Sequence, residues 1–147
     1  MILKISKNFI LCIVLVFVAN SLIAQEVIIG KTFSGKSSYY GKEFIGRKTS
    51  SGEVLREDSY TCAHRTLPFG TMLEVENPKT GKWVVVRVND RGPFSHNRVI
   101  DLSIAAAKKI GLTQAGVFNV TAMIVGKNGE VVFRRDPPAD EISETKK

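Results

Sequence analysis

The chain has 147 residues, a length typical of a single domain, and 44% hydrophobic and 24% charged residues. This composition is that of a globular protein and argues against a disordered chain. The formal net charge of +7 favours an acidic polymer as partner, which could be nucleic acid, an anionic membrane or an anionic cell wall.

The first 24 residues have the pattern of a secretory signal peptide. Lys4 and Lys7 precede the apolar run Phe9–Ala19, and we expect cleavage after Ala24. The run is shorter than the roughly 20 residues that span a bilayer, although an uncleaved anchor is the alternative. Cys12 lies inside the run rather than at its end, so we expect an exported protein of the periplasm or cell envelope without a lipid anchor.

The expected mature chain keeps 19 basic and 14 acidic residues, a net charge of +5, and one cysteine, Cys62. A single cysteine excludes an intramolecular disulfide, and we expect Cys62 to be a small buried hydrophobe. The two histidines, His64 and His96, and the scattered acids show no metal-ligand spacing. We therefore expect neither a metal nor a cofactor.

Short strands separated by glycine-containing loops dominate the mature chain. Thr32–Tyr40 predicts a strand, residues 41–58 a long loop, and Thr71–Glu76 with Lys82–Asn89 a hairpin around the turn at 77–81. In the second hairpin strand every other residue is valine, as expected for a strand with one buried face.

The second half predicts one helix and more strands. Ser103–Ile110 is the helix, with Ser103 as N-cap and Gly111 at the C′ position. Further strands are predicted at Arg98–Leu102, Val117–Val125 and Val131–Phe133. We divide the chain into a leader (25–33), a barrel domain (34–126), a terminal strand (127–135) and a disordered tail (136–147). Four to six short strands favour a small closed barrel, because closure removes exposed sheet edges.

Five strings then occur in order: SSYYG (37–41), GRKTSSGE (46–53), TCAHRTLPFGT (61–71), VVVRVNDRGPF (84–94) and RVIDLSIAAAKKIGL (98–112). With them the chain resembles the rare lipoprotein A (RlpA-like) family over about residues 34–125. The resemblance implies a mainly β fold, a six-stranded double-psi β-barrel with one or two short helices. The same fold is found in membrane-bound lytic transglycosylase A, family-45 endoglucanases and plant expansins.

The resemblance also implies an activity, that of septal-ring endolytic transglycosylases. These cleave the β-1,4 bond between N-acetylmuramic acid and N-acetylglucosamine and leave a 1,6-anhydro end. The implied partner is the glycan strand of peptidoglycan, and we expect a monomer. The basic residues are dispersed and do not alternate with aromatic residues, which argues against nucleic-acid binding.

This chemistry needs an acid/base group that holds its proton near neutral pH, so its pKa must be raised. Asp90 follows the valine strand and matches the family's DRGPF aspartate; Asp101 matches the IDLS aspartate. If both converge in one cleft, repulsion would raise one pKa. The alternatives are that Asp90 stabilises a turn and that Asp101 caps the helix.

Further candidates follow from the same strings. His64 could orient an aspartate, Glu53 could line the cleft, and Tyr40 could stack on a sugar ring. Arg91 and Arg98 could bind lactyl or peptide carboxylates. The alternatives are a structural histidine, a solvated glutamate and arginines paired with the two aspartates.

Two other functions remain open at this point. One is a non-catalytic, expansin-like module that binds peptidoglycan. The other is an ordinary hydrolase in which the two aspartates form an acid–base pair and leave a reducing end.

Overall fold

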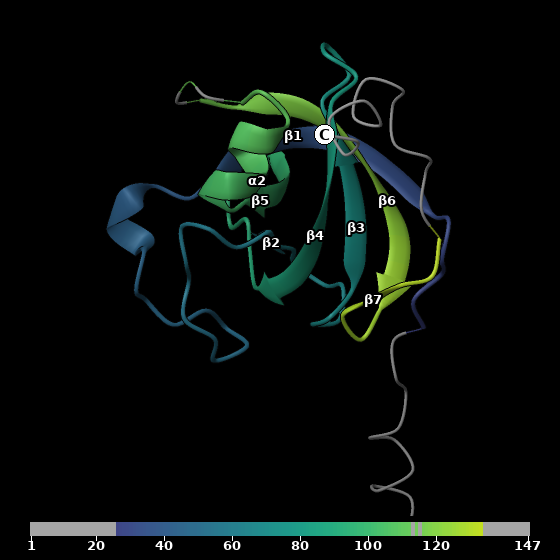
Figure 1. The fold of residues 1–147 in the computed structure, drawn as a ribbon, viewed down its shortest axis with the longest axis horizontal. Helices are drawn as coiled ribbons and strands as arrows, with labels where there is room; N and C mark the ends of the chain where they lie inside the picture. The colour runs from purple at the N-terminus through teal and green to yellow at the C-terminus, as the bar shows by residue number, and fades with distance from the viewer. Residues whose placement is uncertain (1–25, 113, 115, 134–147) are drawn as a thin grey trace, which may run out of the picture.

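The computed structural model describes residues 26–112, 114 and 116–133, so the predicted signal peptide and the predicted tail at 136–147 lie outside the described residues. The elements in chain order are β1 Thr32–Tyr39, the 3-10 helix η2 Lys42–Phe44, β2 Thr61–Ala63, β3 Met72–Glu76, β4 Trp83–Asp90, β5 Arg98–Leu102, α2 Ile104–Lys109, β6 Phe118–Lys127 and β7 Glu130–Val131 (Figure 1).

Six of these strands close into a barrel. Hydrogen bonding runs in the order β1, β5, β2, β4, β3, β6, and β6 pairs again with β1. The pairs β1–β5 and β2–β4 are parallel, and the other pairs of the barrel are antiparallel. The short β7 pairs with β6 outside the closed ring. The predicted six-stranded barrel is thereby confirmed.

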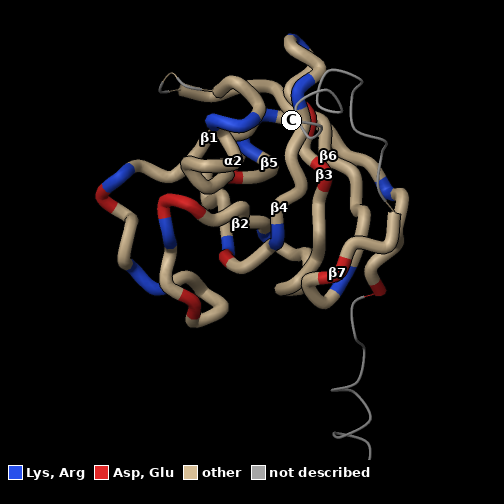
Figure 2. Tube along the Cα trace, in the orientation of Figure 1, with Lys and Arg blue, Asp and Glu red and all other residues tan. Residues whose placement is uncertain are grey.

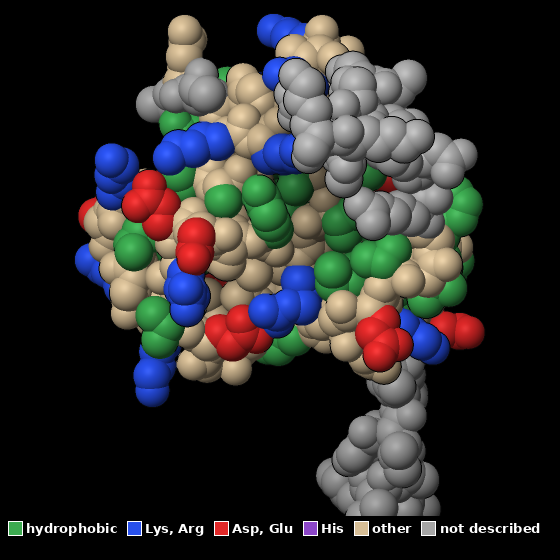
Figure 3. All heavy atoms as spheres, viewed as in Figure 1, with side chains coloured by type: hydrophobic (Ala, Val, Ile, Leu, Met, Phe, Trp, Pro, Cys, Tyr) green, Lys and Arg blue, Asp and Glu red, His purple; other side chains and the backbone are tan. Residues whose placement is uncertain are grey.

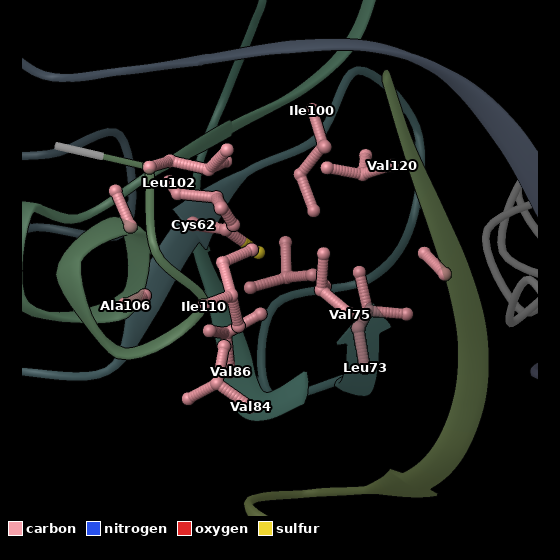
Figure 4. Packing of buried hydrophobic residues seen from close by; sticks show 14 of the residues in the cluster. Cys62, Leu73, Val75, Val84, Val86, Ile100, Leu102, Ala106, Ile110 and Val120 are labelled. Atoms are coloured by element: carbon pink, nitrogen blue, oxygen red, sulfur yellow. The ribbon is translucent and has the colours of Figure 1, made fainter. Parts of the chain in front are cut away.

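The core consists of buried residues of the barrel strands together with residues of α2 and the segment after it, among them Ala106 and Ile110 (Figure 4). The predicted alternation holds in β4, where Val84, Val86 and Val88 are buried. Cys62 of β2 is fully buried among them, and burial raises the pKa of its thiol. It is a core residue, as the sequence predicts, and a buried neutral thiol is a poor nucleophile.

Helix α2 packs against the barrel wall beside β4. The Ser103 hydroxyl accepts a hydrogen bond from the amide of Ala106, and Gly111 takes a positive φ of 78° just after the helix. Both predicted helix ends are thus confirmed. No helix in the described part of the chain has the length and apolar character that crossing a membrane requires.

Strand β1 begins at Thr32, as the sequence predicts for this strand, so its first two residues fall within the stretch assigned to the leader. The structure differs from the sequence-based elements at three places. The strand β2 and the helix η2 were not expected, and η2 lies within the predicted loop 41–58. The last strand is Glu130–Val131 rather than 131–133.

Candidate active site

Asp90 and Asp101 meet at one short strand. Ala63, the last residue of β2, pairs with Asp101 of β5 on one side and with Asp90 of β4 on the other. A register shift after Cys62 brings Asp90 rather than Asn89 opposite Ala63; such bulges re-aim side chains. All three residues line a groove with a volume of about 340 Å³, so the structure brings both predicted acids together.

Asp90 is surrounded by hydrogen-bond donors. Its carboxylate accepts from the Tyr40 hydroxyl at 2.7 Å, from the Ser50 hydroxyl at 2.7 Å, and from the amides of Ser50 and Arg91 at 2.8 Å each. Burial alone would raise the pKa of Asp90, but these donors outweigh it and hold the pKa below its usual range. Asp90 is therefore ionised near neutral pH and does not have the raised pKa that the acid/base group needs.

Asp101 is bound by one hydroxyl and one guanidinium. It accepts from the Ser38 hydroxyl at 2.7 Å and from Nε of Arg98 at 2.9 Å, and its side chain is only 14% exposed. It does not cap α2, since Ser103 does. Pairing with Asp101 was the alternative reading of Arg98, and this pair is present. Arg98 also lines the groove, with its side chain 27% exposed, so its guanidinium lies within reach of a ligand.

Strand β1 supplies a hydroxyl to each acid. Ser38 lies in the strand and Tyr40 follows directly after it; residues two apart project from the same side of an extended chain. Burial, followed by the hydrogen bond to Asp90, raises the pKa of Tyr40 and keeps its hydroxyl protonated as a donor. Tyr40 thus lines the groove, and its hydroxyl also orients Asp90.

The side chain of Arg91 makes contacts that stabilise the fold. Its guanidinium donates to the backbone carbonyls of His64 at 3.2 Å and Leu67 at 2.9 Å, and lies 3.9 Å from the centre of the Phe69 ring. It contributes to the groove lining but its side chain pairs with neither aspartate. These contacts fasten the 64–69 segment to the end of β4.

Arg65, which the sequence analysis did not single out, holds the rim of the groove. Its guanidinium donates to the carbonyls of Pro93, Ser95 and Arg98. One planar donor group thereby ties the whole loop between β4 and β5. The one sequence signal for Arg65 is that it lies within the string 61–71, which carries part of the family resemblance.

His64 does not face the two acids. Its ring lines a separate pocket of about 460 Å³ with Phe33 and Leu67. Its Nδ1 accepts from the amides of Thr66 and Leu67, and burial, helped by Arg91, lowers its pKa to about 4. The imidazole is therefore neutral at pH 7 and organises the 64–67 turn.

Glu53 lies outside the groove as well. It binds Arg87 through both carboxylate oxygens, at 2.6 and 2.8 Å, and accepts from Asn89. The bond from Arg87 is the main reason why its pKa is lowered to about 2. The ion pair anchors the loop that contains Ser50, and Ser50 donates to Asp90. Glu53 therefore supports a groove residue without lining the groove itself.

Exposed aromatic rings border the groove. Phe94 is 87% exposed and Phe44 is 41% exposed, and both line it together with Tyr40. Aromatic faces in such a place suit the apolar C–H faces of sugars. Among the described residues, no group of three or more His, Cys, Asp or Glu side chains is arranged to hold a metal ion.

Comparison with known families assigns this barrel to a family. A family model described as lytic transglycolase matches residues 32–122, which contain the groove and both acids. The chain belongs to the lytic transglycolase family. The structure and this match agree on a double-psi β-barrel, and the resemblance predicted from the sequence strings is confirmed.

Curated relatives of this lytic transglycolase domain carry a more specific name. The endolytic peptidoglycan transglycosylase RlpA of Vibrio cholerae is 54% identical over 96 residues, 65% of this chain and 36% of that protein. Its namesake from Neisseria meningitidis serogroup A is 46% identical over 107 residues, 71% of this chain and 45% of that protein. The chain thus spans less than half the length of these relatives.

Solved structures share the barrel of the family. A Streptomyces papain inhibitor is 27% identical, with a TM-score of 0.56 over 69% of this chain and all of the inhibitor. A Clavibacter michiganensis expansin in complex with cellohexaose is 21% identical, with a TM-score of 0.53 over 74% of this chain and 53% of the expansin. Because one barrel serves an inhibitor and an expansin, function must be argued from the site.

Proposed function

We propose that the chain is an endolytic lytic transglycosylase that cleaves the β-1,4 bond between N-acetylmuramic acid and N-acetylglucosamine in peptidoglycan. The observation that carries the proposal is the pair of carboxylates, Asp90 and Asp101, on either side of Ala63 in one groove. The name shared by the curated relatives supports it. Activity in the cell envelope follows from this substrate, and export through residues 1–24 remains a prediction, as does the monomeric state.

The two acids receive different roles. Asp90 is ionised and firmly held, which suits it to stabilise the positive charge that develops on the sugar ring at the transition state. Asp101 is then the acid/base group. This division of work between two carboxylates follows the general rule that unlike surroundings give paired acids unlike roles.

The reaction uses Asp101 twice. Its carboxyl donates a proton to the glycosidic oxygen as the bond from that oxygen to the anomeric carbon breaks. The 6-hydroxyl of the N-acetylmuramic acid residue that contains this anomeric carbon attacks the carbon and gives its proton to the Asp101 carboxylate. The 1,6-anhydro ring closes without a water molecule, and the acid is restored for the next cycle.

Arg98 has to release Asp101 before this step, because its guanidinium occupies the carboxylate oxygens that must reach the sugar. The Arg98 side chain is partly exposed, so a carboxylate of the substrate can compete for it. Substrate binding and the release of Asp101 are thereby coupled in the proposed mechanism. Phe94 and Tyr40 would hold the sugar rings on either side.

The product decides the proposal. Residues 25–147 are incubated with glycan strands stripped of stem peptides, and the ends are identified by mass spectrometry. We expect 1,6-anhydro ends, a loss of roughly 10²- to 10⁴-fold in rate for Asp101→Asn, and a loss of roughly 10²-fold for Asp90→Asn. Both variants should keep the circular dichroism spectrum and the pull-down on stripped strands of the parent.

Other products select the other functions. Reducing ends instead of anhydro ends would assign the pair to hydrolysis. Binding without any cleavage, under conditions where a known transglycosylase cuts the same strands, would leave a wall-binding module.

A further inference from the structure

The groove does not end at Tyr40. A second hollow of about 450 Å³ shares Tyr39, Tyr40 and Gly41 with the groove of the two aspartates and extends along α2 to Leu112. A third hollow of about 430 Å³ shares Leu112 with the second and contains Phe118, on which the Tyr39 ring stacks. Each hollow therefore shares lining residues with the next, and we call the three together the path.

The charged residues that line these hollows differ. The first hollow contains both aspartates together with Arg91 and Arg98, whereas the second is lined by Lys42 and Lys108 and the third by Lys36 and Lys79. No described Asp or Glu lines the second or third hollow. Basic side chains gather over α2 and the neighbouring part of the surface, as Figure 3 shows in blue.

Two acidic side chains lie next to the path and bear on its charge. Glu57 is 3.4 Å from the Lys108 amine, but both side chains are more than half exposed, and water and salt weaken such a pair. The Glu43 carboxylate lies against Gly41, where the first and second hollows join. Beyond that junction the four lysines give the path its positive charge.

We propose that the lysine-lined part of the path binds carboxylates of the glycan strand beyond the cleaved bond. An enzyme that cuts inside a strand must accommodate sugars on both sides of that bond, and the second hollow lies directly beside the groove of the two acids. The basic part fits a polymer with carboxylates at regular intervals, and its field would attract such a strand. This inference rests on the proposed function, because it identifies the second hollow as a continuation of the active-site groove.

The carboxylates of peptidoglycan have two sources, the lactyl group of the muramic residue and the stem peptide. Binding is therefore measured with stripped strands, which keep the lactyl carboxylate, and with intact strands. A third sample consists of stripped strands whose carboxylates have been converted to amides. Each measurement uses the full chain from residue 25 with Asp101→Asn, so that the strands stay uncut.

Two double variants test the two hollows: Lys42→Gln with Lys108→Gln, and Lys36→Gln with Lys79→Gln. We expect each to weaken binding to stripped or intact strands roughly three- to tenfold at low ionic strength, and less at high salt. The amidated strands should show no such loss. Glu57→Gln should act in the opposite direction, since it frees Lys108 from its partner.

The matched control is Lys31→Gln with Lys127→Gln, which removes two exposed charges from other parts of the barrel. Loss on stripped strands identifies the lactyl group, and loss confined to intact strands identifies the stem peptide. An equal loss on amidated strands, or a loss no larger than that of the control, overturns the inference. The proposed function has its own readout, the anhydro product of the parent chain, so the two can fail separately.

Discussion

The carboxylate of Asp90 accepts four hydrogen bonds. Its donors come from three segments: Tyr40 at the end of β1, Ser50 in the loop 46–55, and the amide of Arg91. Each donor favours the carboxylate over the carboxylic acid. The ionised form of Asp90 is therefore a product of the fold and not of a single neighbour.

Removal of the Tyr40 hydroxyl should make Asp90 easier to protonate. In Tyr40→Phe we expect the pKa of Asp90 to rise toward its usual value, because one of its donors is lost. Activity that needs the ionised form should then fall at a higher pH on the acid side, which a pH–rate profile measures. Tyr39→Phe is the matched control, since Tyr39 stacks on Phe118; an equal shift in both variants would contradict the assignment.

His64 should govern stability below neutral pH. Its folded-state pKa is lowered to about 4, so the unfolded chain binds the proton more readily. The stabilisation is complete above the ordinary pKa of 6.5 and is lost as the pH falls toward 4. We expect a loss on the order of 1 kcal/mol over this range, allowing for partial exposure of the ring, in urea unfolding at several pH values.

Two variants separate the structural role of His64 from a catalytic one. His64→Ala should destabilise the 64–67 turn, because the amides of Thr66 and Leu67 lose their acceptor. His64→Asn should restore much of that stability, since an asparagine oxygen can accept from amides two and three residues ahead. If His64→Asn is stable but inactive, His64 has a direct part in the reaction.

At the scale of elements, β2 decides the geometry of the site. It is three residues long and lies between β5 and β4, and its last residue, Ala63, lines the groove between the two acids. A small side chain at this point leaves room for a sugar. The other residues of the groove come from β1, β4 and β5 and from the segments that follow β1 and β4.

A larger side chain at position 63 should close the groove. We expect Ala63→Leu to lower strand binding and cleavage at least tenfold, because a space of about 340 Å³ is interrupted between its two acids. Ala63→Ser, which adds a single atom, should keep most activity. Both are compared by thermal unfolding; a Leu variant that unfolds at a lower temperature but cleaves normally in the cold would refute the placement of Ala63 in the substrate's path between the two acids.

The sequence predicts some elements well for physical reasons that are visible in this chain. The hairpin of β3 and β4 has period-two valines around a turn, and α2 has a serine cap and a terminal glycine. By contrast, all three residues of β2 are buried, so the strand shows no alternation, and its pairing partners lie 26 or more residues away in the sequence. Local patterns do not contain that information.

The same limit explains why the sequence selected residues that the structure places apart. Motifs selected Asp90, Asp101, His64 and Glu53 together, but the direction of each side chain depends on a register shift and on loop paths that no periodicity encodes. Ser38 and Ser50 were missed because a serine among glycines and serines has no distinguishing pattern. Only the fold shows that each donates to an aspartate.

At the scale of the whole molecule, one closed sheet around one core supports the site. Charged residues are spread along the strands and loops of the chain, as Figure 2 shows, while the core cluster consists of hydrophobic residues. Because the ring has no open edge, weakening one part of the core should weaken all of it. Unfolding of the barrel is therefore expected to be a single cooperative step.

Leu73 provides a test of this cooperativity. It is fully buried in β3, and Leu73→Ala should lower the free energy of unfolding by about 2–5 kcal/mol in urea denaturation. Val131→Ala in β7, outside the ring and 41% exposed, should change it by less than about 0.5 kcal/mol. Separate transitions seen by fluorescence and circular dichroism in the Leu73 variant would argue against a single unit.

The placement of the two acids on either side of one strand has a thermal consequence. Their α-carbons are separated by two steps between neighbouring strands, about 9.6 Å in all, and peptide hydrogen bonds keep those steps constant. Warming can loosen the surrounding loops, but the distance between the α-carbons of the two acids stays the same until the barrel unfolds. Turnover should thus climb smoothly with temperature and then collapse at the same midpoint at which the tertiary structure melts.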